Sequence, residues 1–161
     1  MDIATFFDIS PLEWIDIAVV LFCGGIIGFE RQFLGKPAGI RTSILICMGT
    51  YCFVKIGSAI TGGAADPGRV LSQVITGIGF LGAGVMMNRE GMVFGVTSAA
   101  VIWILAAIGV SIGFRHHGAA IWVSIMTVIL LTFARLMERL FPQLLCGAHK
   151  PVPRDDLPKD F

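Results

Sequence analysis

The chain has 161 residues, which is room for one domain, and 55% of them are hydrophobic while only 14% are charged. A soluble domain of this length needs a charged surface, so the balance excludes an ordinary water-soluble enzyme or binding domain. The formal net charge of +1 says little by itself, because the informative feature is that charged residues cluster between long apolar runs.

Five apolar runs approach the length of about 20 helical residues that crosses the hydrocarbon core of a bilayer. The predicted spans cover residues 12–29, 42–60, 70–87, 91–114 and 118–134. Strands would need alternating apolar and polar residues, so helices are expected. We predict an all-α, polytopic bundle of about five transmembrane helices, with a transmembrane domain over residues 1–141 that lies in the lipid bilayer.

The first span begins with two acidic residues, Glu13 and Asp16. Both are expected at the outer membrane interface, with Asp16 facing the bundle interior as the alternative. A secretory signal would begin with basic residues, so we expect this span to be retained. Later in the span, Gly24 and Gly28 are spaced four residues apart, which favours close packing against another helix.

The first loop separates two charges that each lie at the unfavourable end of a helix dipole. Glu30 is at the carboxyl end of the first span, and Arg41 is at the amino end of the second. We predict that these two residues pair across the loop, while Arg31 faces the lipid headgroups. The alternative is two independent, solvated charges.

The second span carries Lys55, five residues before its end at Ile60. The long side chain is expected to reach outward to the membrane surface. Three cysteines in the spans, Cys23, Cys47 and Cys52, are expected to act as small apolar residues and not as metal ligands.

The third span contains a G-x-G-x-x-G pattern formed by Gly77, Gly79, Gly82 and Gly84. A dinucleotide-binding motif must follow a strand and open a helix, whereas this pattern lies inside an apolar span. Close helix packing is the favoured interpretation. The alternative is a locally unwound helix whose carbonyl groups line an ion path.

The last two spans hold the remaining residues of interest. Trp103 lies in the middle of the fourth span and is expected to pack inside the bundle, and Gly109 and Gly113 repeat the spacing of close helix contact. The adjacent His116 and His117 occupy the next turn and are expected to be solvated, with a pH-sensing role as the alternative. The proline-containing segment 142–161 predicts a flexible cytoplasmic tail.

The basic residues near the span ends divide unequally between the two membrane faces. Arg31, Lys36, Arg41, Arg89 and the basic residues of the tail lie on one face, and Lys55, Arg69 and Arg115 lie on the other. The positive-inside rule therefore predicts an amino terminus outside and a carboxyl terminus in the cytoplasm. Five crossings agree with that arrangement.

Four sequence blocks in a fixed order resemble the MgtC/SapB family. They are GGIIGFERQ from residue 24, KPAGIRT from residue 36, VITGIGFLGAG from residue 74, and GVTSAAVIW from residue 95 with AAIG following at 106–109. The resemblance marks as candidate site residues Gly24, Gly28, Glu30, Arg31, Gly39, Arg41, Thr42, Gly77, Gly79, Gly82, Gly84 and Thr97.

The resemblance implies a multi-pass protein of the bacterial inner membrane, linked to magnesium-limited growth, virulence and survival inside host cells. It implies a regulator of other membrane proteins, since the best-known member is regarded as an inhibitor of the F-type ATP synthase. Many relatives carry a soluble domain after the fifth span, where only a short tail follows here. Thr97 stands where relatives vary between Asn and Thr.

Two function classes stay open. The favoured one is a regulatory protein whose helix faces dock on a membrane-protein partner, and a second copy of the chain is a further candidate partner. The other is a cation transporter or channel, which for Mg²⁺ should bring several oxygen ligands together. The spans offer only Asp16 and Glu30 as carboxylates, at opposite faces. No enzymatic activity, cofactor, metal site or nucleic-acid partner is predicted.

Overall fold

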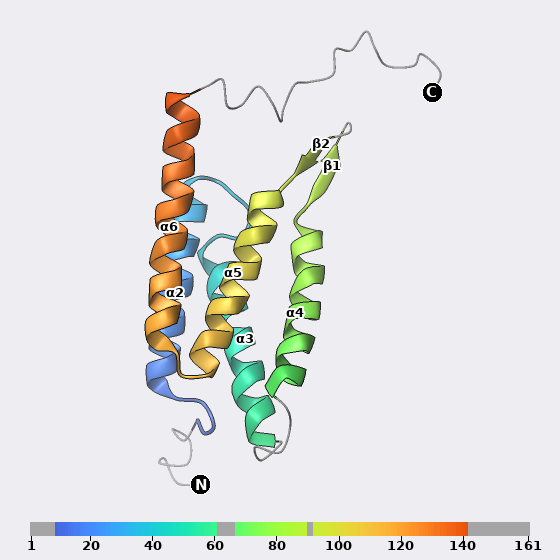
Figure 1. The fold of residues 1–161 in the computed structure, drawn as a ribbon, viewed down its shortest axis with the longest axis vertical. Helices are drawn as coiled ribbons and strands as arrows, with labels where there is room; N and C mark the ends of the chain where they lie inside the picture. Colours follow the sequence, from blue (N-terminus) through green and yellow to red (C-terminus); the bar gives the residue numbers. More distant parts are fainter. Residues whose placement is uncertain (1–8, 61–66, 90–91, 142–161) are drawn as a thin grey trace, which may run out of the picture. The chain divides into compact units, whose positions relative to one another are not determined.

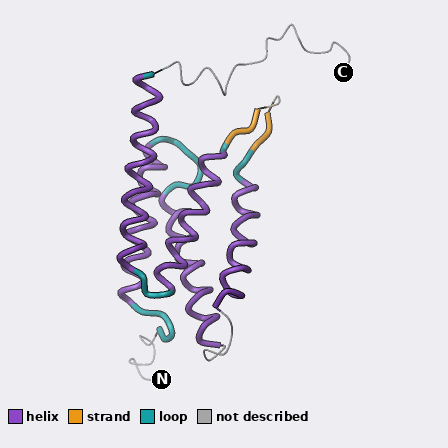
Figure 2. Tube along the Cα trace, in the orientation of Figure 1, coloured by secondary structure: helices purple, strands orange, loops and turns teal. Residues whose placement is uncertain are grey.

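The computed structural model describes residues 9–60, 67–89 and 92–141, and this part of the chain is almost entirely helical (Figures 1 and 2). Its helices are α2 (Trp14–Phe33), α3 (Ile40–Ile60), α4 (Pro67–Gly84), α5 (Val96–Gly113) and α6 (His117–Leu140). A short hairpin of β1 (Met87–Arg89) and β2 (Met92–Phe94) joins α4 to α5. The predicted all-α helical bundle is therefore confirmed.

The chain divides into two compact units, residues 1–128 and residues 129–161. In the first unit the helices run alternately up and down, so sequence neighbours are antiparallel (Figure 1). Within it α3 packs against α2, α4 and α5, and α5 also packs against α2 and α4. The described part of the second unit is residues 129–140 of α6, together with Phe141. The predicted tail, residues 142–161, lies outside the described residues.

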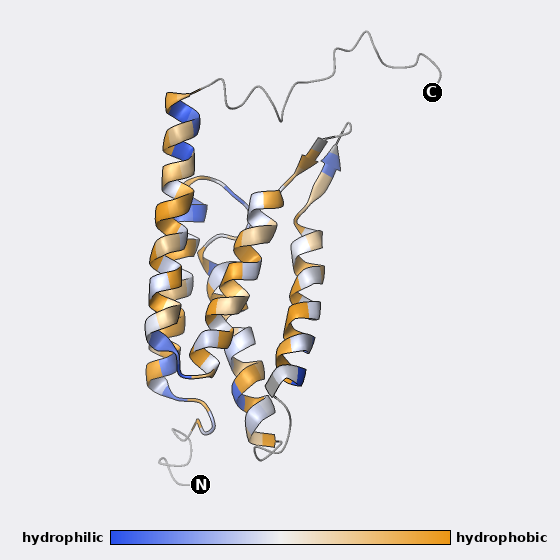
Figure 3. Cartoon of the chain, in the orientation of Figure 1, coloured by the Kyte–Doolittle hydropathy of each residue, from blue (hydrophilic) through white to orange (hydrophobic). Residues whose placement is uncertain are grey.

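The core of the first unit is centred on α5, half of whose residues are buried. Its sequence is apolar on all sides, as expected for a helix that is covered by neighbours and lies in an apolar solvent. Figure 3 shows apolar residues along the lengths of the helices and hydrophilic residues gathered mainly near their ends. By length and composition, α3, α5 and α6 can each cross a membrane. That the chain crosses the membrane five times and that its amino terminus lies outside stay predictions.

The predicted fourth span, 91–114, is wrong at its beginning. Residues 92–94 form β2, which pairs antiparallel with β1 in the register Met87 with Phe94 and Asn88 with Val93. Helix α5 begins only at Val96, because Gly95 has a φ of +88°. Side chains other than glycine disfavour that left-handed conformation. A Cβ atom at Gly95 would also collide with the Val85 carbonyl oxygen.

Close contact through glycine is confirmed between α2 and α3. A Cβ atom on Gly28 would lie 2.6 Å from Ile40 Cα, and one on Gly24 would lie 2.9 Å from Ile44 Cα. Both distances are shorter than real Cβ atoms accept, so only glycine permits this separation of the two backbones. Small residues serve the same purpose where membrane helices pack.

Glycines allow the same close contact between α5 and α3. A Cβ atom on Gly109 would lie 2.5 Å from the Cys47 carbonyl oxygen, and one on Gly113 would lie 2.6 Å from Val54 Cγ1. Helix α3 is thus held closely on two sides, by α2 and by α5. The prediction from the spacing of Gly109 and Gly113 is also confirmed.

The glycine-rich part of α4 differs from expectation. Helix α4 continues without interruption to Gly84, so the unwound alternative does not describe it. Added Cβ atoms on Gly77, Gly79 and Gly84 would meet nothing within 4 Å, so the packing interpretation is wrong at these three positions. Of these four glycines only Gly82 lies against a neighbouring helix: a Cβ atom added to it would lie 3.7 Å from Trp103 Cδ1. Trp103 itself is 45% exposed, so the prediction that it packs inside the bundle is wrong.

These contacts predict opposite effects for two glycines one turn apart on α2. Gly28→Ala should lower the free energy of unfolding by about 1–3 kcal/mol, since α2 must move away from Ile40 to admit the methyl group. Gly25→Ala is the matched control, with open space around its Cβ position. It should raise the same free energy by up to about 1 kcal/mol through helix propensity. Unfolding in mixed micelles measures both, and equal effects would contradict the glycine contact.

Candidate functional site

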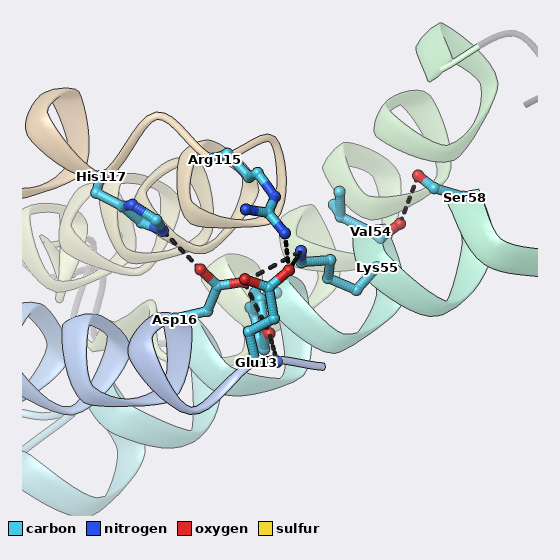
Figure 4. Close-up of polar contacts among 8 residues, drawn as sticks. Glu13, Asp16, Val54, Lys55, Ser58, Arg115 and His117 are labelled. Carbon is cyan, nitrogen blue, oxygen red and sulfur yellow. Dashed lines mark hydrogen bonds and ion pairs between the residues drawn. The ribbon is translucent and has the colours of Figure 1, made fainter. Parts of the chain in front are cut away.

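Polar side chains gather at the end of the first unit where α2 and α6 begin, and Figure 4 labels Glu13, Asp16, Lys55, Arg115 and His117 among them. We call this cluster the polar network, and its members are Glu13, Asp16, Tyr51, Lys55, Arg115 and His117. Glu13 and Asp16 belong to the start of α2, and Tyr51 and Lys55 belong to α3. The last two come from the turn between α5 and α6 and from the first residue of α6. The network therefore connects three separate parts of the unit.

Local geometry explains how the network is assembled. Tyr51 and Lys55 are four residues apart on α3, so their side chains share one face of that helix. Arg115 occupies a left-handed conformation, φ +62°, in the tight turn that ends α5. This turn allows α6 to start at His117 beside the first turn of α2.

Asp16 is the centre of the network and is completely buried, at 0% exposure. Its Oδ1 atom lies 2.6 Å from His117 Nε2. Its Oδ2 atom accepts a hydrogen bond of 3.0 Å from the Tyr51 hydroxyl and lies 3.1 Å from Lys55 Nζ. An isolated carboxylate would be very unfavourable in such a place, so the surrounding donors are required for its burial.

Lys55 joins the two acidic residues. Its Nζ atom lies 3.1 Å from Asp16 Oδ2 and 3.2 Å from Glu13 Oε1, and its side chain is only 12% exposed. Glu13 Oε1 also binds the guanidinium group of Arg115. The Tyr51 hydroxyl accepts a 3.0 Å hydrogen bond from the Glu13 backbone N–H, at the N-cap of α2. The network thus places two carboxylates against two permanent cations and one histidine.

Three predictions for these residues are corrected. Lys55 does not reach outward but points inward to both carboxylates. Asp16 is buried in the interior of the bundle, which was the alternative prediction, and not at the membrane interface. His117 contacts Asp16, whereas its neighbour His116 is exposed as expected. Sequence reasoning missed these contacts because the partners are 35 to 101 residues apart.

The first loop is closed differently from the prediction. Among the ion pairs of the described residues none joins Glu30 to Arg41, and Arg41 is exposed. The loop is closed instead by Gln32, whose Oε1 accepts a 3.2 Å hydrogen bond from the Ile40 backbone N–H. Gly39 leaves room for this side chain, since its own Cβ atom would lie 3.1 Å from Gln32 Oε1. The contact follows from α2 continuing to Phe33, past its predicted end.

Arg31 does not face the headgroups but is buried, at 3% exposure. Its Nη2 atom donates a 2.6 Å hydrogen bond to Ser98 Oγ near the start of α5. Two further candidates near this end, Thr42 on α3 and Thr97 on α5, are exposed. Arg31 therefore ties α2 to α5 at the end opposite to the polar network.

Cys23 and Cys47 are buried free thiols, and Cys47 Sγ donates to the Leu105 carbonyl oxygen at 3.1 Å. The described ranges hold no group of three His, Cys, Asp or Glu residues placed to bind a metal ion. Between α3 and α4 lies an apolar groove of about 410 Å³, which we call the α3–α4 groove. It is lined by Thr50, Phe53, Gln73, Val74, Gly77, Ile78 and Leu81.

Comparison with known proteins places this arrangement in context. The sequence matches the MgtC family over residues 17–140. It is 42% identical over 132 residues to the putative magnesium transporter YhiD of Escherichia coli (strain K12), which covers 77% of this chain and 61% of that protein.

Two further relatives bear the name protein MgtC. The Brucella abortus (strain 2308) protein is 37% identical over 143 residues, covering 88% of this chain and 60% of the relative. The Salmonella typhimurium (strain LT2) protein is 40% identical over 121 residues, covering 73% and 51%. The chain therefore spans about half to three-fifths of the length of these relatives. No solved structure matches it.

The polar network predicts a large effect for its central cation. Lys55→Met should lower the free energy of unfolding by about 3–5 kcal/mol, because Asp16 stays buried without its ammonium partner. Adding Asp16→Asn to this variant should recover part of the loss, since the buried charge is then removed. Unfolding in micelles measures both variants.

Lys36→Met is the matched control, because Lys36 is an exposed lysine in the first loop. It should change the free energy of unfolding by less than about 0.5 kcal/mol. A Lys55→Met variant as stable as this control would show that the buried pairs do not hold the helices together.

Proposed function

Since the chain belongs to the MgtC family, we propose that it is an inner-membrane regulator that docks on another membrane protein under magnesium limitation. The magnesium context rests on the relatives, one of which is named a putative magnesium transporter. The role in virulence and the regulatory mode rest on the family resemblance. The proposal includes no catalytic step and no bound cofactor.

One observation favours regulation over transport: both carboxylates of the polar network are already paired with cationic side chains. Mg²⁺ requires near-octahedral oxygen coordination and usually keeps several water molecules. Both Glu13 and Asp16 are instead held by Lys55, whose Nζ atom lies within 3.2 Å of each. A divalent cation at this place would meet an ammonium group beside each carboxylate. The arrangement supports a role in fixing the helices of a rigid scaffold.

Helix α4 supplies a surface for the proposed docking. Among residues 68–84 of this helix only Ile78 and Gly82 are buried, and Gly77 and Gly84 have open space beside them. Membrane helices associate where small residues let their backbones approach, because lipid is as apolar as their side chains. The α3–α4 groove, with Gly77 in one wall and Phe53 in the other, is suited to receive side chains from a transmembrane helix of the partner.

A photo-crosslinking residue at exposed Phe80 of α4, which precedes the groove residue Leu81 in the sequence, tests this proposal in native membranes. Gly77→Leu adds a bulky side chain to the groove wall at a position where a Cβ atom would meet nothing within 4 Å, and it should lower capture of the partner at least about tenfold, roughly 1.4 kcal/mol of binding free energy. Gly25→Leu is the control, since it places the same side chain at an open glycine of α2. Subunits of the F-type ATP synthase among the captured proteins would identify the partner that the resemblance implies.

Two results of that experiment would count against docking on α4. One is equal capture by the unsubstituted chain and by Gly77→Leu. The other is an equal loss in Gly25→Leu, which would indicate a general effect of bulk and not a filled groove. Mass spectrometry of the crosslinked bands gives both readouts.

The second candidate function is cation transport, favoured by the name of the Escherichia coli relative. In liposomes containing the purified chain and a magnesium-sensitive dye, we expect no saturable Mg²⁺ uptake above protein-free vesicles. Glu30 is the carboxylate of the spans that lies outside the polar network and is only half-exposed. Saturable uptake that Glu30→Gln abolishes would replace the regulatory proposal by transport.

A further inference from the structure

We propose that a second copy of the chain packs along α6, so that two α6 helices form a parallel coiled coil at their carboxyl ends. The contact is made by four large apolar residues of the second unit, which we call the α6 seam: Ile129, Phe133, Leu136 and Leu140. The proposal uses no residue of the polar network, of α4 or of the α3–α4 groove. It therefore goes beyond the proposed function and does not depend on it.

The α6 seam has the residue spacing of a coiled coil. Its members follow one another at steps of four, three and four residues, which is the spacing of the a and d positions of a heptad. This spacing keeps all four side chains on one face of the helix, and each of them is at least 50% exposed. The same spacing continues toward the amino end of α6 at Met126 and Trp122, which are 58% and 67% exposed.

The other faces of α6 have different residues. In the first unit its buried residues are Ala120 and Ser124, which lie on the side of the helix opposite to Met126 and Trp122. The helix is therefore covered by its neighbours on the side with small residues, and the side with large residues is left exposed.

Charged residues avoid the α6 seam. Within the last turns of the helix, Arg135 and Glu138 lie on the side opposite to the seam, and Arg139 lies at its edge. Coiled coils carry their charged residues beside the apolar seam or away from it. Two seams can therefore meet without bringing like charges into contact.

The carboxyl end of α6 reaches beyond the part of the membrane where lipid chains can cover apolar side chains. A helix of 24 residues is about 36 Å long, whereas the hydrocarbon core is about 30 Å thick. Charged residues are costly in the core, so Arg135 and Glu138 place the end of the helix among headgroups and water. Figure 3 shows hydrophilic and apolar residues side by side there. Leu136 and Leu140 lie at the same depth, where excluding water favours their burial against protein.

The symmetry of a membrane favours a second copy as the occupant. All copies with one topology have α6 pointing in the same direction, so a two-fold axis along the membrane normal brings each seam residue to the depth of its counterpart. Exposed apolar side chains of this size contribute roughly 100 Å² each. The four seam residues together with Met126 and Trp122 would thus bury about 1,200 Å² over both copies, which reaches the lower limit of a specific interface.

Energy transfer between donor-labelled and acceptor-labelled full chains in liposomes tests the pairing. The unsubstituted chain should show transfer that increases with the ratio of protein to lipid. Leu136→Glu and Leu136→Lys each place like charges opposite one another across the axis, and each should weaken association at least about tenfold. A mixture of the two variants brings opposite charges together and should recover at least about half of the transfer.

Glu138→Lys is the matched control, because it introduces a lysine at an exposed position on the opposite side of the same turns. It should keep the transfer of the unsubstituted chain. Three results would overturn the proposal: full transfer in the single Leu136 variants, no recovery in their mixture, or an equal loss in Glu138→Lys. Absence of concentration-dependent transfer in the unsubstituted chain would overturn it as well.

Photo-crosslinking keeps the test informative if the charged variants do not insert. A benzoylphenylalanine in place of Phe133 changes little in size and should link residues 126–140 of two copies, as identified by mass spectrometry. Adducts with lipid alone, or with a different protein alone, would overturn pairing through the seam. Neither readout uses the α3–α4 groove, so failure here leaves the proposed function standing, and failure of partner capture at α4 leaves the pairing standing.

Discussion

The burial of one carboxylate determines how the helices of the first unit meet. Asp16 has no contact with solvent, so its charge must be matched from within the protein. Lys55 and Tyr51 of α3 supply that match on one oxygen, and His117 of α6 supplies it on the other. Any sliding of α3 along α2 would separate these groups. The polar network therefore fixes the register of the helices, whereas the glycines of α2 and α5 fix their separation.

The pairing of charges also bears on how the chain sits in the membrane. Lys55 and Arg115, which count as positive charges on the predicted outer side, are both neutralised by carboxylates of the network. At the opposite end Lys36 and Arg41 are exposed and available to the membrane surface. Arg31, which counts as a positive charge on the predicted inner side, is buried against Ser98, so it too is withdrawn from the headgroups. The orientation with the amino terminus outside therefore stays a prediction from the sequence count.

The sequence predicted the helices and two of the three glycine contacts, because hydropathy and small-residue spacing are local signals. It did not predict the polar network, because the residues of the network come from distant parts of the chain. The one local signal was the position of Lys55 within an apolar run, since a charged residue in a membrane span usually has a charged partner. It also misplaced Arg31, because a helix that continues to Phe33 turns this side chain toward Ser98. The error at the start of α5 arose from Met92 to Phe94, which are as apolar as the helix that follows but form a strand before Gly95.

Helix α4 contrasts with the rest of the first unit and gives the regulatory proposal its physical basis. Its hydroxyl groups at Ser72 and Thr76 are satisfied by backbone carbonyls within the helix, but both side chains are exposed, as is the amide of Gln73. Polar groups that face lipid are unfavourable and usually turn toward protein or water. A helix with this polar face, open glycines and few buried residues is poorly suited to lipid alone. A partner helix in the α3–α4 groove would cover Gln73 and Gly77 together, whereas a lipid chain offers the amide no hydrogen bond.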